Sequence, residues 1–95
     1  MVVSFEEYVK EALKRAIYCR NKDKKGYTVT VPDLAGCVSW GETIEEARDM
    51  IKDAIEGWVI TALQFGDSIP VLSGKSLAGL KKRRVKGLAQ AGRYA

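Results

Sequence analysis

The sequence predicts an α+β fold in which an N-terminal helix precedes a three-stranded antiparallel sheet, and a long amphipathic helix packs on that sheet. Three observations lead to this prediction. Apolar and polar residues alternate over residues 27–31, which is the period of a strand with one buried face. At two places a serine or threonine is followed three positions later by glutamate, the spacing of a capping box at a helix start. After Ile44, apolar residues recur at intervals of three and four, as in an amphipathic helix.

The first element is a predicted helix that runs to about Arg15. Ser4 and Glu7 form its capping box, and apolar residues at helical spacing give it one face to bury. The period then changes, and we interpret residues 17–20 as the first strand. The polar residues 21–26 form the turn to the second strand.

The second and third strands are predicted to form a hairpin with a rigid loop. The second strand ends at Pro32, because proline has no N–H to donate to a sheet. Asp33 and Gly36 are turn residues, so residues 32–36 are interpreted as a surface loop. Residues 37–40 form the third strand, and so few residues separate the two runs that they should pair antiparallel.

The long helix begins at the second capping box, Thr43 and Glu46. Glu42, Glu45 and Glu46 place negative charge at the positive end of the helix dipole, so we interpret them as helix-start residues rather than catalytic carboxylates. Trp58 is in register with the apolar stripe and is expected to pack rather than to stack on a ligand. The helix should end near Gly66, and residues 71–72 give a weaker signal for a short fourth strand. The stripe consists of Ala47, Ile51, Ala54, Ile55, Trp58, Ala62 and Leu63.

Length and composition indicate a soluble, cytoplasmic protein. The chain has 95 residues, of which 46% are hydrophobic and 29% charged. No apolar run approaches the roughly 20 residues that span a bilayer, and no signal peptide is visible. A chain this short buries a small share of its surface, so we expect a homo-oligomer, either a dimer or a tetramer. Cys19 and Cys37 both fall on predicted strands, where buried thiols are expected rather than a disulfide.

Charge divides the chain into an acidic domain, residues 1–74, and a basic tail, residues 75–95. The whole chain carries +4, and the tail has seven basic and no acidic residues, which leaves −3 on the domain. Three interpretations of the tail stay open: it binds nucleic-acid phosphates, it lies on an acidic face of a neighbouring subunit, or it is solvated. The candidate nucleic-acid-binding residues are Lys81, Lys82, Arg83, Arg84 and Lys86.

The sequence contains no recognisable catalytic constellation. It has no histidine, which excludes Ser-His-Asp and Cys-His mechanisms within this chain, and it has no phosphate-binding or dinucleotide-binding glycine motif. Asp33, Glu42 and Glu46 together give only a weak signal for a divalent cation, since such carboxylates are common. We therefore expect a protein that is not an enzyme and that holds no cofactor or metal.

Residues 27–70 resemble the HicB-type antitoxins of bacterial and archaeal toxin–antitoxin pairs. The resemblance rests on YTVTVPDLAGC at residues 27–37, GETIEEA at residues 41–47, and the closing Gly66 to Pro70. It implies a partial ribonuclease H fold without nuclease activity, which binds and neutralises a small HicA-type toxin that cleaves messenger RNA. Loops on rigid scaffolds often carry recognition, so the candidate partner-binding residues are those of the loop and the adjoining helix start: Asp33, Leu34, Gly36, Glu42 and Glu46.

Two features depart from this family pattern. The 25 residues after Pro70 are too few for the ribbon-helix-helix or helix-turn-helix module through which many members repress their own operon. The basic tail would repel a toxin that binds RNA, so the acidic domain is expected to make the contact. The alternative function is a nucleic-acid-binding regulator that acts through the basic tail, with DNA or RNA as its partner.

Overall fold

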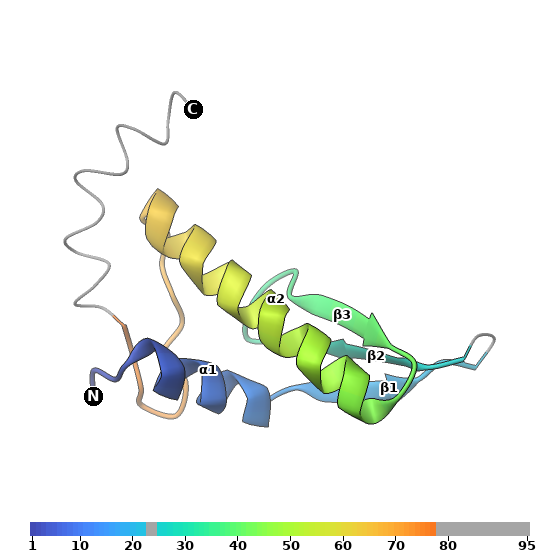
Figure 1. Ribbon diagram of the computed structural model, residues 1–95. Coiled ribbons are helices and arrows are strands. Elements are labelled where there is room, and N and C mark those ends of the chain that lie inside the picture. Colours follow the sequence, from blue (N-terminus) through green and yellow to red (C-terminus); the bar gives the residue numbers. More distant parts are fainter. Residues whose placement is uncertain (23–24, 78–95) are drawn as a thin grey trace.

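The computed structural model describes residues 1–22 and 25–77, and its elements follow the predicted order (Figure 1). The sheet has the strand order β1-β2-β3, and both neighbouring pairs are antiparallel. The predicted α+β fold of two helices and a three-stranded antiparallel sheet is therefore confirmed. The elements are α1 (Phe5–Lys14), β1 (Ile17–Arg20), β2 (Tyr27–Thr30), β3 (Val38–Gly41) and α2 (Ile44–Phe65).

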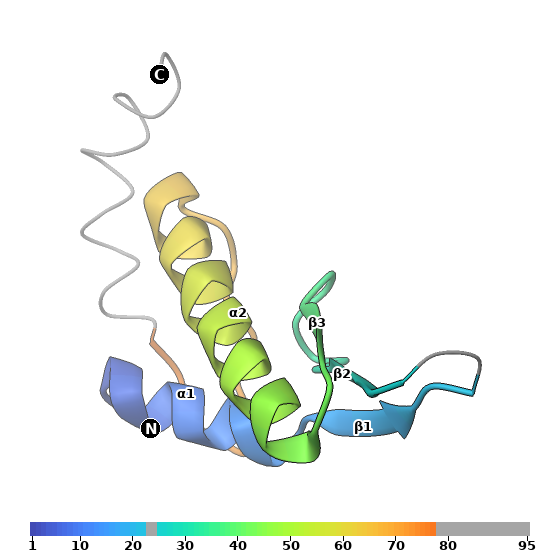
Figure 2. The same ribbon diagram turned by 45° about the vertical axis from the view of Figure 1, so that its right-hand side comes forward.

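One face of the sheet is covered by α2 and the other is open (Figure 2). In the strand register, Val29 of β2 lies between Tyr18 of β1 and Ser39 of β3, and Val29 is fully buried against the helix. Successive side chains in a strand point to opposite faces. Ile17 and Val38, which flank Thr30 in the next row, therefore lie on the open face, and both are exposed.

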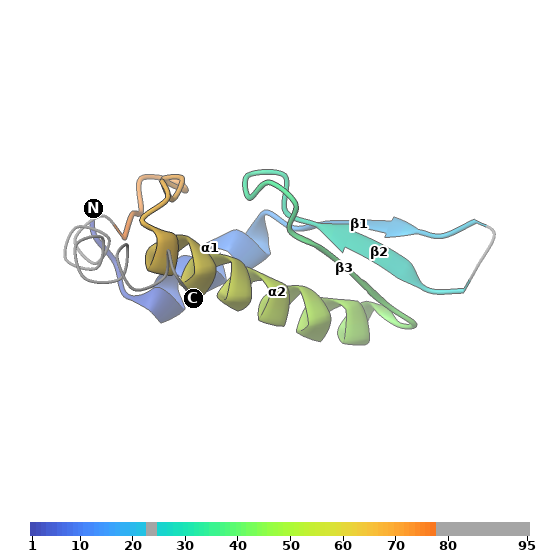
Figure 3. The same cartoon turned by 90° about the horizontal axis from the view of Figure 1, so that it is seen from above.

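α2 is longer than the sheet that it covers, and its second half passes beyond the strands (Figure 3). α1 packs against α2 beside Arg48, Lys52 and Glu56, and apolar residues of α1 and of residues 69–77 join the buried stripe of α2 in one core. Within the described ranges, no helix is both long and apolar enough to cross a membrane. The buried residues of α2 are Ala47, Ile51, Ile55, Val59 and Ala62.

The helix ends follow from local sequence. Ser4 Oγ accepts a hydrogen bond from the Glu7 N–H at 3.1 Å, and Thr43 Oγ1 accepts one from the Glu46 N–H at 3.0 Å. Gly66 ends α2 in the left-handed conformation, with φ of 70°, which glycine adopts without steric cost. The two predicted capping boxes and the predicted glycine cap are confirmed.

Three local predictions are corrected by the structure. The short fourth strand does not form at residues 71–72; Leu72 instead makes one isolated bridge to Lys75 across a tight turn. Cys37 precedes β3 and belongs to the loop, where its N–H donates to the Leu34 carbonyl. Cys19 is exposed because it lies on the open face of the sheet, whereas Cys37 is buried; both thiols are free.

Residues 75–77, the first three of the predicted basic tail, pack against the N-terminal segment. Ser76 forms a parallel bridge with Val2, and Leu77 is buried. The neighbouring turn is fixed to α1 by the Tyr8 hydroxyl, which donates to the Pro70 carbonyl, and burial raises the pKa of Tyr8 to about 12. The folded unit therefore reaches Leu77, and the five candidate nucleic-acid-binding residues lie outside the described residues.

Candidate partner-binding surface

Asp33 is held by an ion pair at the base of the loop between β2 and β3. Its Oδ1 accepts a hydrogen bond from Arg15 Nε at 3.0 Å, and Arg15 Nη1 also donates to Ser73 Oγ at 3.2 Å. The bond from Arg15 holds the pKa of the Asp33 carboxyl below its usual range. Asp33 thus connects the loop to the end of α1, and its carboxylate is already engaged within the protein.

Leu34 and Gly36 occupy opposite environments in the same loop. The Leu34 N–H donates to the Val31 carbonyl, and the Cys37 N–H donates to the Leu34 carbonyl, each at 2.9 Å. These two tight turns direct the Leu34 side chain inward, where it is 1% exposed, so the expectation that it lies in an exposed loop is wrong. Gly36 is exposed and has a φ of 81°, which favours glycine.

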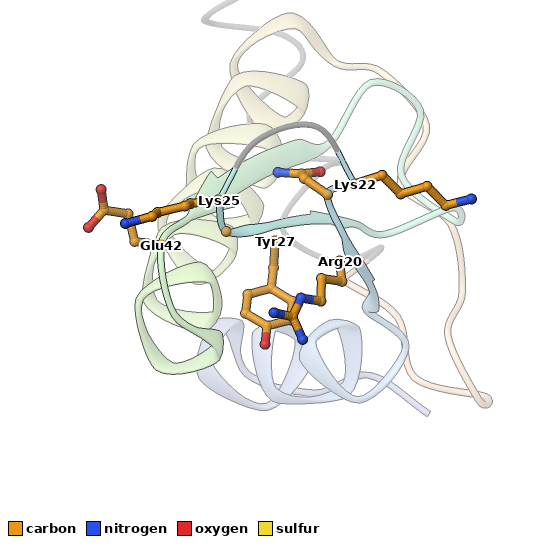
Figure 4. Close-up of a pocket in the computed structure, with 7 residues that line it drawn as sticks. Arg20, Lys22, Lys25, Tyr27 and Glu42 are labelled. Atoms are coloured by element: carbon orange, nitrogen blue, oxygen red, sulfur yellow. The ribbon is translucent and has the colours of Figure 1, made fainter.

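Glu42 and Glu46 are exposed, but one of them also builds the helix start. Glu46 Oε1 accepts a hydrogen bond from the Glu42 N–H at 2.6 Å, close to the second half of a capping box. The Glu42 side chain lines an open pocket of about 890 Å³ at the end of the β1–β2 hairpin. Three of the seven described residues that line this pocket are cationic, namely Arg20, Lys22 and Lys25 (Figure 4).

The five predicted residues do not form one site. Thr30 pairs with Val38 at the loop end of the hairpin, and Tyr27 pairs with Gly41 at the other end. Asp33 follows the first of these ends, while Glu42 and Glu46 follow the second. The weakly signalled cation site from these carboxylates is therefore not assembled, and the part of the chain that the structure describes contains no cluster of three potential metal-binding side chains.

The first half of α2 instead presents a row of carboxylates that we name the acidic ridge: Glu45, Glu46, Asp49 and Asp53. All four are exposed and lie away from the buried stripe. Arg48 and Lys52 lie beside α1, since they line surface pockets together with Lys10 and Leu13. Lys52 pairs with Glu56 at 3.9 Å, and among the described residues no ion pair reaches the ridge.

Helix stability does not explain the acidic ridge. Like charges four residues apart on a helix destabilise it by about 0.2 to 0.5 kcal/mol per pair. Glu45 with Asp49, and Asp49 with Asp53, are two such pairs. The helix dipole favours acidic residues only in the first turn, so Asp49 and Asp53 receive little compensation from it. Their arrangement suits an external, positively charged partner.

Asp49 and Asp53 were not among the predicted partner-binding residues, which ended at the helix start. The signal was present, because positions 46, 49 and 53 repeat at intervals of three and four on the face opposite the apolar stripe. The connection of Asp33 to Arg15 had no such signal, since the two residues are 18 positions apart and meet only through the tertiary fold.

The fold and the surface define a small α+β protein in which one long helix covers a short antiparallel sheet and presents charged residues to solvent. Within that class, the chain belongs to the UPF0150-like family, whose family model matches residues 7–70.

Similar proteins come from distant organisms. A UPF0150 protein of Helicobacter pylori is 45% identical over 62 residues, which cover 65% of this chain and 72% of that protein. The UPF0150 protein Ta0767 of Thermoplasma acidophilum is 40% identical over 50 residues, which cover 52% of this chain and 72% of that protein. The crystal structure of TTHA0281 from Thermus thermophilus matches with a TM-score of 0.66 and 31% identity, over 70% of this chain and 83% of that chain.

Proposed function

We propose that this protein is a HicB-like antitoxin: a non-enzymatic binding protein that neutralises a small HicA-type toxin by covering its RNA-binding surface. The observation that carries the proposal is the acidic ridge of α2. The sequence resemblance over residues 27–70 and membership of the UPF0150-like family support it.

The physical argument is electrostatic complementarity. A toxin that cleaves messenger RNA needs a positive surface for the phosphates, and a negative surface of similar extent competes for it. The ridge lies on a 22-residue helix whose opposite face is fixed in the core by Ile51 and Ile55, both fully buried. The carboxylates are therefore presented on a rigid element, which limits the ordering that binding requires.

The experiment measures binding to the purified product of the adjacent reading frame, where that frame encodes a small basic protein. The variant Asp49→Lys with Asp53→Lys reverses two ridge charges. The control, Glu6→Lys with Asp67→Lys, makes the same change in net charge at exposed positions away from the ridge. We expect the ridge variant to weaken binding at least about tenfold and the control variant to change it by less than about threefold.

Two results would overturn the proposal. One is the absence of binding between the wild-type chain and the neighbouring product at low salt. The other is an equal loss of affinity in the ridge and control variants, because net charge alone would then account for binding. Release of RNA cleavage inhibition by the ridge variant, measured with a labelled messenger RNA, gives a second readout.

The second candidate function is that of a nucleic-acid-binding regulator. The observation that favours it is the pocket at the end of the β1–β2 hairpin. Of the residues that the structure describes, Arg20, Lys22 and Lys25 border that pocket together with Glu42. Together with the basic residues after position 77, they would contact phosphates.

The truncation that tests this alternative removes residues 78–95, because residues 75–77 belong to the folded unit. Affinity for DNA and RNA is measured across a salt series in the full chain, in the truncated chain, and in the full chain with Arg20, Lys22 and Lys25 replaced by serine. Loss of affinity with a reduced salt slope supports the alternative. Unchanged affinity in all three proteins excludes it.

A further inference from the structure

The two edges of the sheet differ in how well they are protected. An exposed strand edge offers unpaired N–H and C=O groups to any other strand, and proteins usually protect it with charges, proline or a bulge. β1 ends in Arg20 and leads into Lys22 and Lys25 at the hairpin. β3 has no charge and no proline, and it pairs with β2 residue for residue without a bulge. β3 is therefore the unprotected edge.

The strip of α2 beside β3 is also uncharged. Ser39 Oγ donates to the Met50 carbonyl at 3.3 Å, which fixes this side of the helix over the strand. Further along, Ala54, Gly57 and Thr61 line a groove of about 450 Å³ together with Val38, neighbouring loop residues and residues 67–68, of which Asp67 is charged. Arg48 and Lys52 lie on the side of the helix next to α1, and Glu46 and Asp53 border the strip, so the strip has the character of a contact surface with an acidic margin.

We propose that the β3 edge is the interface with a second copy of this chain, in which two β3 strands pair antiparallel across a two-fold axis at Ser39. In a continuous sheet, directly opposite residues must point to the same face. A register with Ser39 opposite the partner's Ser39 satisfies this condition. It also places Val38 opposite the partner's Trp40 on the open face, and such β-branched and aromatic pairs stabilise antiparallel sheets.

The same register accounts for the uncharged strip. Because α2 packs over β3, pairing of the strands brings the two α2 helices to the same face of a six-stranded sheet. Met50, which is 46% exposed, then lies near the axis. Cys37 becomes the neighbour of the partner's Gly41, so the partner's residues 41–43 approach the groove. Ala54 and Gly57 leave room for this approach, and nothing lies within 4 Å of a Cβ built on Gly57.

The choice of a second copy as occupant follows from the symmetry of these contacts. One surface supplies Val38, Trp40 and Met50 on both sides of the axis, as an isologous interface requires. Within the acidic ridge, Glu46 and Asp53 lie one turn from Met50 and border the strip, whereas Glu45 and Asp49 lie farther round the helix and stay accessible.

The experiment is sedimentation of the full chain, whose mass is 10.5 kDa, with matched substitutions on the two edges. Val38 and Ile17 lie in the same cross-strand row, and each is 54% exposed. We expect the wild-type chain to sediment as a dimer or as a multiple of it, and Val38→Glu to raise the dimer dissociation constant at least about tenfold. Ile17→Glu should leave that constant unchanged.

Gly57→Arg supplies a second variant on the helix side, and circular dichroism verifies that each variant is folded. This substitution should also weaken the dimer, because the long side chain enters the groove that the partner approaches. A wild-type chain that stays monomeric up to about 100 µM overturns the proposal. Equal weakening by Ile17→Glu and Val38→Glu overturns it as well. Asp49→Lys alone should leave the dimer intact, because position 49 lies away from Met50 and Gly57 on the helix, which separates failure of this interface from failure of the toxin contact.

Discussion

The two halves of α2 share one buried stripe but differ completely on their outer surface. Residues 44–56 include seven charged side chains, whereas residues 57–65 include none. Buried residues occur along both halves, from Ala47 to Ala62, so both halves contribute to the same core. The difference follows what each half lies beside: the charged half lies over the sheet and beside α1, and the uncharged half passes beyond the strands, where Trp58 bonds to the loop residue Ala35.

The largest loss of stability is expected from a substitution in the core where the two halves of α2 meet. Ile55 is fully buried, so Ile55→Ala should lower the free energy of unfolding by about 2 to 5 kcal/mol through lost burial and a cavity. Ile60 is 47% exposed, and Ile60→Ala should change the same quantity by no more than about 0.5 kcal/mol. Urea unfolding followed by circular dichroism measures both. Similar losses in the two variants would mean that the second half buries its outer face in an assembly.

The next largest effects are expected at two glycines, Gly41 before the charged half of α2 and Gly57 at the start of the uncharged half. A Cβ on Gly41 would clash with the backbone of Glu46 and Ala47 at the start of the charged half, so Gly41→Ala should destabilise the protein by about 1 to 3 kcal/mol. A Cβ on Gly57 meets open space, and Gly57→Ala should stabilise the helix by about 0.5 to 1 kcal/mol. Thermal unfolding of the two variants provides the test. A destabilising Gly57→Ala would contradict the open surroundings of that residue.

The smallest change in stability is expected from a substitution in the acidic ridge, which should stabilise the fold but weaken binding. Asp49→Asn removes two like-charge pairs, with Glu45 and Asp53, and should raise the free energy of unfolding by a few tenths of a kcal/mol. The same substitution should weaken the proposed toxin contact. Unfolding and binding measured on one preparation test this opposition. A variant that is both less stable and unimpaired in binding would show that the ridge has a structural role.

Much of the fold could be predicted because its signals are local. The boundaries of β1 and α2 follow from changes of period, and the helix starts follow from capping residues within four positions of one another. The same reasoning located Gly66 as the cap, because a left-handed residue after an apolar stripe is a local requirement.

What could not be predicted depends on distant contacts. Leu34 turns inward because two tight turns bring it over the core, although its neighbours Asp33 and Ala35 suggest a surface loop. Ser76 packs beside Val2 although nearly the whole described chain separates them. The division of the sheet into a charged and an uncharged edge likewise needs the strand order, which fixes β2 in the middle.

The hydrogen bond from Trp58 Nε1 to the Ala35 carbonyl, at 2.9 Å, makes this indole a spectroscopic reporter of the loop between β2 and β3. The chain contains two tryptophans, and Trp40 occupies the open edge of the sheet. Replacing one of them leaves a single fluorophore that observes either the loop or the edge. Fluorescence emission can therefore follow events at the two surfaces separately in an otherwise unlabelled protein.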